Sequence, residues 1–237
     1  MAVTISSTVT KGQTPTATTS TSASSITVAS GQSLMLGVVT DGTSKTVTSA
    51  TFNSGAQAFS LVDAQNVSTT CRCEVWEIVA PTAGSGTITV NLSATALHAF
   101  IAAVVDGAEA GAGYRDAATK TSATASSTPS LTVTSATNDL AIAFIGNINT
   151  NSTATADASP VSQVAVITSG TGASNVRMWL LQETGAASTS PSGVYGGTRD
   201  WAAVGFNLNV LSAASGGGGG RLNRARRVAS WYMTNGR

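Results

Sequence analysis

Two short runs with strand-like patterning, joined by a turn-forming segment, constrain this chain more than any other feature. In the run 87–92 every second residue is Ile, Val or Leu, which is the two-residue period of a half-buried β-strand. The preceding run, 73–80, is rich in apolar residues as well, and the segment 81–86 between them holds one proline and two glycines. Proline presets φ and glycine permits positive φ, so this segment favours a chain reversal. The sequence therefore predicts a β-hairpin over 73–92.

Strand-like patterning continues along the chain, with no helical period before the C-terminal arm to compete with it. Breaks such as Asp41-Gly42 and Ser54-Gly55 recur at the spacing that is typical of β-sandwiches and barrels. Val, Ile and Thr dominate the patterned segments, and these residues favour strands. We predict an all-β fold, namely a two-layer antiparallel β-sandwich with jelly-roll-like connections and flexible terminal extensions. Candidate strands in the first half are 26–28, 34–40, 46–52, 58–62 and 97–106.

Composition divides the chain into four segments. Residues 1–25 are a Ser/Thr-rich N-terminal extension, 26–211 form the sandwich, 212–220 are a glycine-rich linker, and 221–237 are a basic, aromatic C-terminal arm. Half of the sandwich alone would leave an apolar sheet face exposed to water. We therefore expect one merged core over 26–211.

The second half of the predicted sandwich resembles the first. The pattern around Leu34 returns around Leu140, and the pattern around Trp76 returns around Trp179, at nearly equal separations. Short strands alternate so readily that this likeness has two interpretations. The sandwich is either a pair of pseudo-repeated halves or a single sandwich whose core strands share one pattern.

The C-terminal arm differs from the rest of the chain in its charge. Five consecutive glycines, 216–220, precede a segment with five arginines and no acidic residue. A glycine run is a flexible tether, arginine forks suit carboxylates and phosphates, and aromatic residues are typical of interface centres. We predict that the arm binds a groove on another protein; contact with nucleic acid and a solvated tail are the less favoured alternatives. The predicted partner-binding residues are Arg221, Leu222, Arg224, Arg226, Arg227, Trp231, Tyr232, Met233 and Arg237.

Two long connections of small residues, 107–129 and 185–198, are candidates for a ligand-binding site. Loops of this length often carry binding residues. The alternative is a surface loop that packs through its own tyrosine or against a neighbouring subunit. The predicted ligand-loop residues are Tyr114, Arg115, Asp116 and Tyr195.

The reactive residues do not form a catalytic pattern, so we predict that the protein is not an enzyme. A serine hydrolase needs a base beside its serine, and His98, the single histidine, lies in an alternating apolar run that predicts a core or interface position. Glu74 and Glu77 are three residues apart on one predicted strand and point to opposite faces, unlike the facing acids of a glycosidase. Cys71 and Cys73 are expected to be reduced packing residues, too few for a zinc site with one histidine. We predict no catalytic residue, no metal site and no cofactor.

Charge is scarce in this chain. Charged residues make up 10% of it, against roughly 25% in an ordinary soluble domain, so Ser, Thr, Asn and Gly must cover the surface. The start of the chain lacks the apolar core of a secretory signal, and no run is long and apolar enough for a membrane-spanning helix. We expect synthesis in the cytoplasm of a host cell and no membrane partner.

Several of these segments resemble a known β-sandwich module. The sequences VWEIVAP (75–81), GTITVNLS (86–93), VVDG (104–107) and NDLAIA (138–143) are similar to a module of tailed-bacteriophage virion proteins and of some bacterial surface proteins. The resemblance covers residues 26–210 and leaves out the arm. It implies a jelly-roll-like or lectin-like sandwich that assembles as a homo-oligomer on a virus particle, with capsid or tail subunits as partners.

The first hypothesis is therefore a non-enzymatic virion component, a capsid decoration or cement protein that docks on neighbouring subunits through its terminal arms. The alternative is a host- or carbohydrate-binding adhesin, such as a tail-fibre or head-fibre module. A polysaccharide-degrading enzyme on this sandwich is the least favoured, because it needs an acid pair that the sequence does not reveal.

Overall fold

The computed structural model describes residues 2–12, 16–23, 25–53, 56–109, 114–148, 154–157, 161–169 and 175–211. These residues form β-strands and their connections, and no helix occurs among them. The strand ladders are antiparallel. The predicted all-β antiparallel sandwich is therefore confirmed. The predicted linker 212–220 and arm 221–237 lie outside the described residues.

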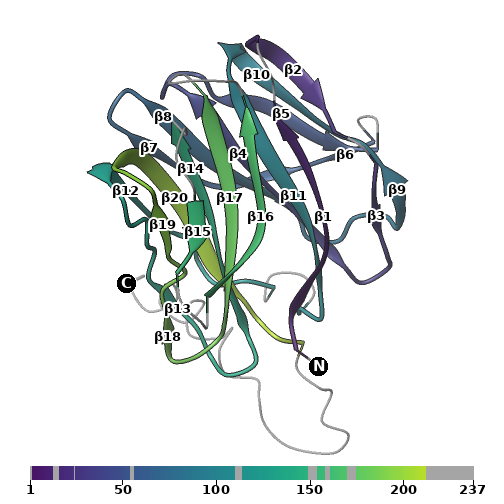
Figure 1. The fold of residues 1–237 in the computed structure, drawn as a ribbon. Coiled ribbons are helices and arrows are strands. Elements are labelled where there is room, and N and C mark those ends of the chain that lie inside the picture. The colour runs from purple at the N-terminus through teal and green to yellow at the C-terminus, as the bar shows by residue number, and fades with distance from the viewer. Residues whose placement is uncertain are drawn as a thin grey trace, which may run out of the picture.

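Three sheets form the body (Figure 1). Sheet A has the order β1 (Thr4–Gly12), β11 (His98–Asp106), β4 (Ser33–Asp41), β8 (Cys71–Ile78) and β7 (Ser60–Val67). Sheet B has the order β2 (Thr18–Ser22), β10 (Ile88–Ala96), β5 (Val47–Phe52) and β6 (Gln57–Ala58). Sheet C has the order β12 (Thr119–Ser126), β20 (Arg199–Leu208), β14 (Leu140–Ile148), β17 (Val176–Thr184) and β16 (Val161–Ser169).

Three two-stranded ladders complete the fold. They pair β3 (Ile26–Val28) with β9 (Gly84–Gly86), β13 (Val133–Thr134) with β18 (Ser188–Thr189), and β15 (Ala154–Ala156) with β19 (Gly193–Tyr195). In the first half the chain crosses repeatedly between sheets A and B, with β5 and β6 both in sheet B and β7 and β8 both in sheet A. The detailed jelly-roll assignment stays a prediction.

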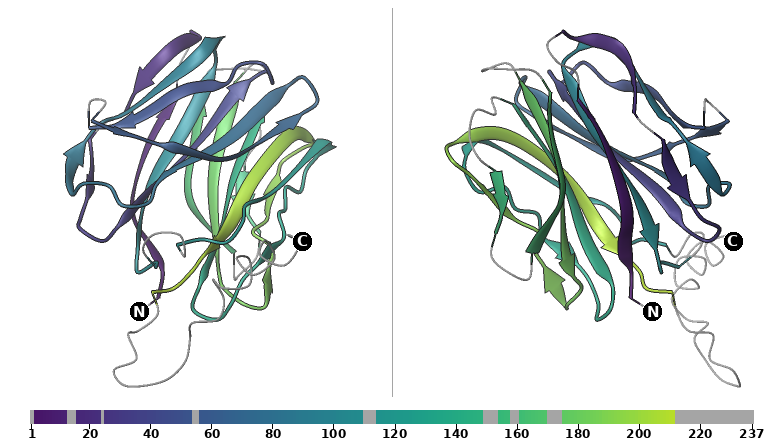
Figure 2. Two further views of the ribbon diagram at one scale, coloured as in Figure 1. Left: turned by 180° about the vertical axis from the view of Figure 1, so that it is seen from behind. Right: turned by 45° about the vertical axis from the view of Figure 1, so that its right-hand side comes forward.

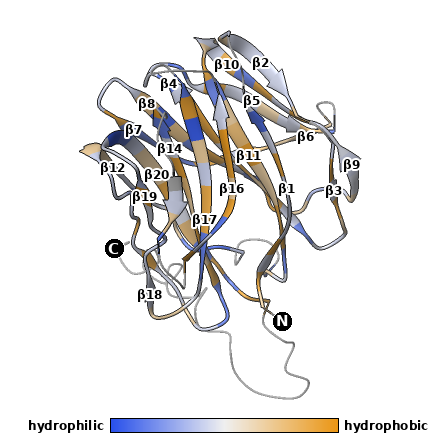
Figure 3. Ribbon diagram, in the orientation of Figure 1, coloured by the Kyte–Doolittle hydropathy of each residue, from blue (hydrophilic) through white to orange (hydrophobic). Residues whose placement is uncertain are grey.

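Sheet A lies in the middle of a stack (Figure 2). One face packs on sheet B, where Leu36 and Ile88 share a core, and the other packs on sheet C, where Ile101 and Phe144 share a second core. A third core around Trp179 lies on the far face of sheet C, under the small ladders. Because both faces of sheet A are buried, hydrophobic residues follow β4 and β11 almost without interruption (Figure 3). The stack thus has more than the two layers predicted.

The predicted hairpin over 73–92 is wrong. Strand β8 lies in sheet A, where it pairs with β4 and β7, whereas β10 lies in sheet B, where it pairs with β2 and β5. The segment between them, predicted as the turn, instead carries the chain from one sheet to the other and includes β9. Gly86 fits there because a Cβ atom would lie 2.8 Å from the Phe52 ring.

Most of the predicted N-terminal extension takes part in the sheets. Strand β1 pairs with β11 at the edge of sheet A, and β2 pairs with β10 at the edge of sheet B. The weak alternation of apolar residues near the N-terminus arises because this strand turns one face to the core. Val3 is buried, and Ile5 packs against the core between sheets A and C. An edge strand needs few apolar residues because its backbone hydrogen bonds hold it in place.

The described chain consists of two halves with the same plan, residues 2–109 and 114–211. In sheet order, β1, β11, β4, β8 and β7 correspond to β12, β20, β14, β17 and β16. The ladder β3–β9 corresponds to β13–β18, and the pair β5–β10 corresponds to β15–β19. Among the described residues β2 and β6 have no counterpart in the second half.

The two halves meet face to face through sheets A and C, in a pseudo-symmetric manner. Strand β1 packs against β16, and its counterpart β12 packs against β7. Likewise β11 packs against β17, and β20 packs against β8. Reciprocal pairs of this kind define a two-fold interface, here within one chain.

Glycines let β4 and β14 approach each other at the centre of this interface. A Cβ atom on Gly37 would lie 2.1 Å from the Phe144 ring, and one on Gly146 would lie 2.6 Å from a Val39 methyl. Each strand therefore places a bulky side chain where the other has none. Because both strands are nine residues long, Gly37 corresponds to Phe144 and Val39 to Gly146.

The same alignment corrects the likeness seen in the sequence between Leu34 and Leu140. Leu34 points to sheet B, whereas Leu140 belongs to the core between sheets A and C. Their true correspondence differs by one residue, and a one-residue shift moves a side chain to the other face of a strand. Leu34 therefore corresponds to Ala141.

Candidate functional site

The predicted ligand-loop residues Tyr114, Arg115 and Asp116 hold their connection against the body. Tyr114 is 1% exposed and lies in the core between sheets A and C. Arg115 makes a bidentate ion pair with Glu77, with Nε–Oε2 and Nη2–Oε1 distances of 2.8 and 2.9 Å. Asp116 accepts a hydrogen bond from the Asn209 amide at 3.3 Å. These contacts leave the three residues little freedom to meet a ligand.

Tyr195, the fourth predicted loop residue, lies elsewhere. It is 2% exposed and stacks on Trp179, with ring centroids 5.1 Å apart and planes inclined by 17°. Both belong to the core on the far face of sheet C. The structure therefore places Tyr195 and Tyr114 on opposite faces of this sheet, so they do not form one site.

The nine predicted partner-binding residues of the arm lie outside the described residues. Their role stays a prediction.

The two cysteines are buried and free. Their thiols donate to backbone carbonyls of β14, Cys71 to Gly146 at 3.8 Å and Cys73 to Phe144 at 3.6 Å. Burial raises the pKa of the Cys73 thiol to about 12 and raises that of Cys71 further. A buried thiol of this pKa is inert as a nucleophile at neutral pH.

The part of the chain that the structure describes contains no group of three His, Cys, Asp or Glu side chains that could hold a metal ion. Within these same ranges, no helix has the length and hydrophobicity that crossing a membrane requires.

The outer faces of sheets A and C, which point away from the interface between the halves, each carry a row of polar residues. Strand pairing defines both rows, and each row takes one residue from each of three neighbouring strands. The first row is Arg72, Thr40 and His98, on β8, β4 and β11. The second row is Arg177, Asn147 and Trp201, at the corresponding positions of β17, β14 and β20.

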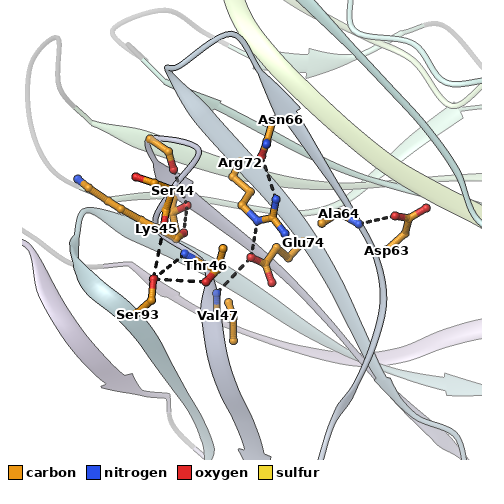
Figure 4. A network of polar contacts seen from close by, with 12 residues as sticks. Ser44, Lys45, Thr46, Val47, Asp63, Ala64, Asn66, Arg72, Glu74 and Ser93 are labelled. Carbon is orange, nitrogen blue, oxygen red and sulfur yellow. Dashed lines mark hydrogen bonds and ion pairs between the residues drawn. The ribbon is translucent and has the colours of Figure 1, made fainter.

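An acidic residue neutralises the first row (Figure 4). Glu74, 2% exposed, accepts hydrogen bonds from Arg72 Nε at 2.6 Å, from the Trp76 indole at 3.0 Å and from the Val47 amide at 3.1 Å. Arg72 also donates to Asn66 Oδ1 at 3.0 Å. Both carboxylate oxygens of Glu74 are thus occupied, as a buried charge requires.

The other members of the first row differ in how fully they are hydrogen-bonded. The Thr40 hydroxyl donates to the Lys45 carbonyl at 2.8 Å. His98 is fully buried, with Nδ1 3.2 Å from the Ala96 carbonyl, and Nε2 has no partner within the described ranges. Burial lowers the pKa of His98, so the imidazole is neutral at neutral pH.

The second row has no acid at the corresponding position, because Trp179 stands where β8 has Glu74. The Trp179 indole donates to Gln163 at 2.7 Å. Asn147 is fully buried and Trp201 is 4% exposed, yet Asn147 Oδ1 and Trp201 Nε1 have no hydrogen-bond partner among the described residues.

Two further residues extend the second row. Arg199 lies two residues before Trp201 on the same face of β20, and its buried Nε has no partner in the described part of the chain. The phenol oxygen of Tyr195 also lacks one there. Arg177 and Arg199 both act electrostatically on Tyr195, and burial lowers the pKa of Arg177. We call Asn147, Arg177, Tyr195, Arg199 and Trp201 the second-half cluster.

The sequence analysis missed the second-half cluster apart from Tyr195. The available signal was polar residues within apolar strands, such as Asn147 after Gly146 and Arg177 beside Met178. That signal does not reveal which strands lie side by side, so it does not assemble a site.

Sheet B presents a different kind of surface, a face without charge. Its four strands contain no charged residue. On the side away from sheet A, the Ser22 and Thr89 hydroxyls are 2.8 Å apart and the Asn91 amide donates to the Ser49 hydroxyl at 2.9 Å. We call this side the hydroxyl face; it consists of Ser20, Ser22, Ser49, Thr51, Thr89 and Asn91.

Comparison of the chain with protein-family models, with curated proteins and with solved structures gives no match.

Proposed function

We propose that this protein is a non-enzymatic structural component of a bacteriophage virion, a capsid decoration or cement protein that binds neighbouring virion subunits. The observation that carries the proposal is the hydroxyl face of sheet B, an uncharged sheet surface lined by small polar side chains. Such a surface can be covered by another protein without desolvating ions, which is the costly part of burying a polar surface.

The use of the reactive side chains supports a structural role. Cys71 and Cys73 are buried with raised pKa values, and Glu74 is fully occupied by its donors. His98 is buried as well. In each case the side chain contributes to packing or to hydrogen bonding within the body.

The partners in this proposal are capsid or tail subunits and other copies of the chain, and its location is the virion. The arm, with Arg221, Arg224 and Trp231 among its predicted binding residues, is the proposed attachment to a neighbouring subunit. Nucleic acid and membranes are not proposed as partners.

The direct test uses virions grown without the gene for this chain. The purified full chain is added, virions are recovered by sedimentation, and the bound copies are counted against the major capsid protein. We expect stoichiometric binding, and no binding at any protein concentration would contradict the proposal. Deletion of 212–237 should reduce occupancy, and full occupancy after this deletion would show that the arm is not the attachment.

A charge-insertion pair tests the hydroxyl face. Thr51→Lys combined with Thr89→Lys places two cations on the face and should lower occupancy strongly. The matched control is Thr124→Lys combined with Ser162→Lys, two exposed positions on sheet C. Equal occupancy for both pairs would exclude the hydroxyl face as a contact surface.

One observation favours a second candidate function, that of a host- or carbohydrate-binding adhesin. The second-half cluster holds buried polar atoms without partners in the described chain, which a ligand could satisfy. A glycan array together with the virion assay distinguishes the two functions, because an adhesin binds defined glycans whereas a cement protein binds capsids.

A further inference from the structure

Buried side-chain polar atoms without partners gather in the second-half cluster. They are Asn147 Oδ1, Tyr195 Oη, Arg199 Nε and Trp201 Nε1, each without a hydrogen bond to the described residues. Asn147 is 0%, Tyr195 2% and Trp201 4% exposed. Native proteins satisfy nearly all buried polar atoms, so a group of unsatisfied ones requires a physical explanation.

The strand register places these atoms together. Asn147 and Trp201 lie directly opposite each other on β14 and β20, and Arg177 lies opposite Asn147 on the other side. Arg199 is the next residue along β20 on the same face. Tyr195 lies on β19 and stacks on Trp179, which is two residues after Arg177 on the same face of β17. The cluster therefore draws its members from four strands, β14, β17, β19 and β20.

In the first row, by contrast, His98 Nε2 is the one buried side-chain polar atom without a partner among the described residues. At the corresponding positions Arg72 has its carboxylate partner Glu74, and the Thr40 hydroxyl donates to a backbone carbonyl. Glu74 corresponds to Trp179 in the second half, and Thr40 corresponds to Asn147. Two differences within one topology thus accompany a row with one unsatisfied atom and a cluster with four.

The available groups define what would satisfy them. Tyr195, Trp201 and Arg199 offer an O–H and two N–H donors, and Asn147 Oδ1 is an acceptor. Arg177 and Arg199 add positive charge, and the cluster contains no acid. Donors with positive charge suit an oxyanion, and one acceptor beside them suits a hydroxyl group.

We propose that the second-half cluster binds an oxyanion that carries a neighbouring hydroxyl group, the chemistry of an acidic sugar or a sugar phosphate. Arg199 is partly exposed and contacts the anion first, and the buried members of the cluster bind its remaining oxygens. This site goes beyond the proposed structural function and does not depend on it.

The test is a titration of the full chain by calorimetry and by NMR of the tryptophan indole N–H signals. The probes are glucuronate, inorganic phosphate and, as the neutral control, glucose. We expect glucuronate, phosphate or both to bind and to shift the Trp201 signal, which Trp201→Phe assigns. Binding of one anion alone identifies the source as carboxylate or phosphate. No binding of either anion, or equal binding of glucose, overturns the proposal.

Substitutions locate the site. Arg199→Gln should weaken anion binding by about tenfold or more, since a hydrogen bond to a charged group has this value. Lys11→Gln makes the same charge change at an exposed residue of β1 and should leave binding unchanged. Equal affinities of the two variants would overturn the proposal.

Besides Trp201→Phe, which assigns the indole signal, Tyr195→Phe gives a second measurement that does not depend on Arg199. Tyr195→Phe removes one O–H group and keeps the ring, and it should weaken anion binding by about tenfold. Without ligand it should leave the unfolding midpoint equal or higher, because an unsatisfied polar group is lost. A lower midpoint with unchanged anion affinity would indicate a purely structural role and overturn the proposal.

The result of the anion-binding test can be distinguished from the result of the virion assay. A chain that binds capsids without binding the anions retains the proposed function and loses this inference. A chain that binds the anions but not capsids has the reverse result.

Discussion

The two halves of this molecule share a strand order and differ in how they cover it. In the first half a continuous four-stranded sheet B covers sheet A, whereas in the second half the described cover of sheet C consists of two short ladders. The polar rows differ accordingly. Glu74 satisfies Arg72 in the first row, and Trp179 occupies its place beside the second row.

This difference shows how one strand topology can carry two polar rows with different hydrogen bonding. Backbone pairing determines where a row of side chains will lie, since corresponding strands bring corresponding positions together. The residues at these positions determine whether the arginine of the row has a carboxylate beside it, as at Glu74, or an indole, as at Trp179. A single acid-to-tryptophan exchange changes both the charge and the hydrogen-bonding capacity of the row.

The largest expected effect is on Glu74, because the first row depends on its charge. Glu74→Ala should lower the free energy of unfolding by about 3 kcal/mol, since it leaves Arg72 partly buried without its carboxylate. Trp179→Phe at the corresponding position keeps a ring and loses one hydrogen bond to Gln163, so about 1–2 kcal/mol is expected. Urea unfolding measures both. Equal losses of unfolding free energy in the two variants would contradict the idea that Glu74 and Trp179 have different roles in their rows.

The second prediction concerns the contact that the halves share. Gly37→Ala should cost about 1–3 kcal/mol, because the new methyl overlaps the Phe144 ring. Adding Phe144→Leu should recover part of this loss. Gly197→Ala is the control, since the nearest atom to its Cβ is 3.4 Å away at the flexible end of Arg199. Failure of the double variant to recover stability would argue against the interlocking of β4 and β14.

The third prediction is that the stability of the protein depends on pH through one residue of the first half, His98. Burial lowers the pKa of His98 below the value of 6.5 that it has when exposed. Below that pH the unfolded chain binds a proton that the folded chain does not, so stability falls as the pH falls from 7 toward 5. The slope is at most about 1.4 kcal/mol per pH unit.

His98 is the single histidine of the chain, and Trp201 at its counterpart does not titrate. Urea unfolding at several pH values should therefore show a weaker dependence in His98→Gln than in the wild type. Asp41 acts on His98 and remains in the variant. The same slope in both proteins would assign the dependence to other groups.

The smallest expected effect concerns an ion pair that bridges the halves. Lys120 on β12 lies 2.8 Å from Asp63 on β7, and its side chain is 47% exposed. Lys120→Gln should change the free energy of unfolding by about 0–1 kcal/mol, as exposed pairs do. Thermal unfolding at low and high salt checks this. A larger loss would mean that polar contacts, rather than the apolar core, hold the halves together.

Strand positions were largely predictable from the sequence, and strand partners were not. The run 87–92 alternates as a strand should, and β10 (Ile88–Ala96) occupies it. Its predicted partner in the hairpin lies in another sheet, because a short connection can join neighbouring strands of one sheet or cross to a packed sheet about 10 Å away. Alternation alone does not distinguish these cases.

The candidate sites divide in the same way. Burial of His98, Cys71 and Cys73 follows from their apolar neighbours in the sequence, and the structure buries all three. The second-half cluster depends on residues that are far apart in the chain, such as Asn147 and Trp201. Their adjacency arises from the pairing of β14 with β20, which no local pattern encodes.

By itself, the sequence determined that this chain folds into antiparallel sheets and which residues avoid water, because side-chain alternation and turn chemistry act over a few residues. Only the tertiary structure decided that sheet A is covered on both faces, that the halves correspond, and that the second half gathers more unsatisfied polar atoms than the first row. These properties depend on contacts between distant segments, whose free energy is gained only when the whole stack assembles.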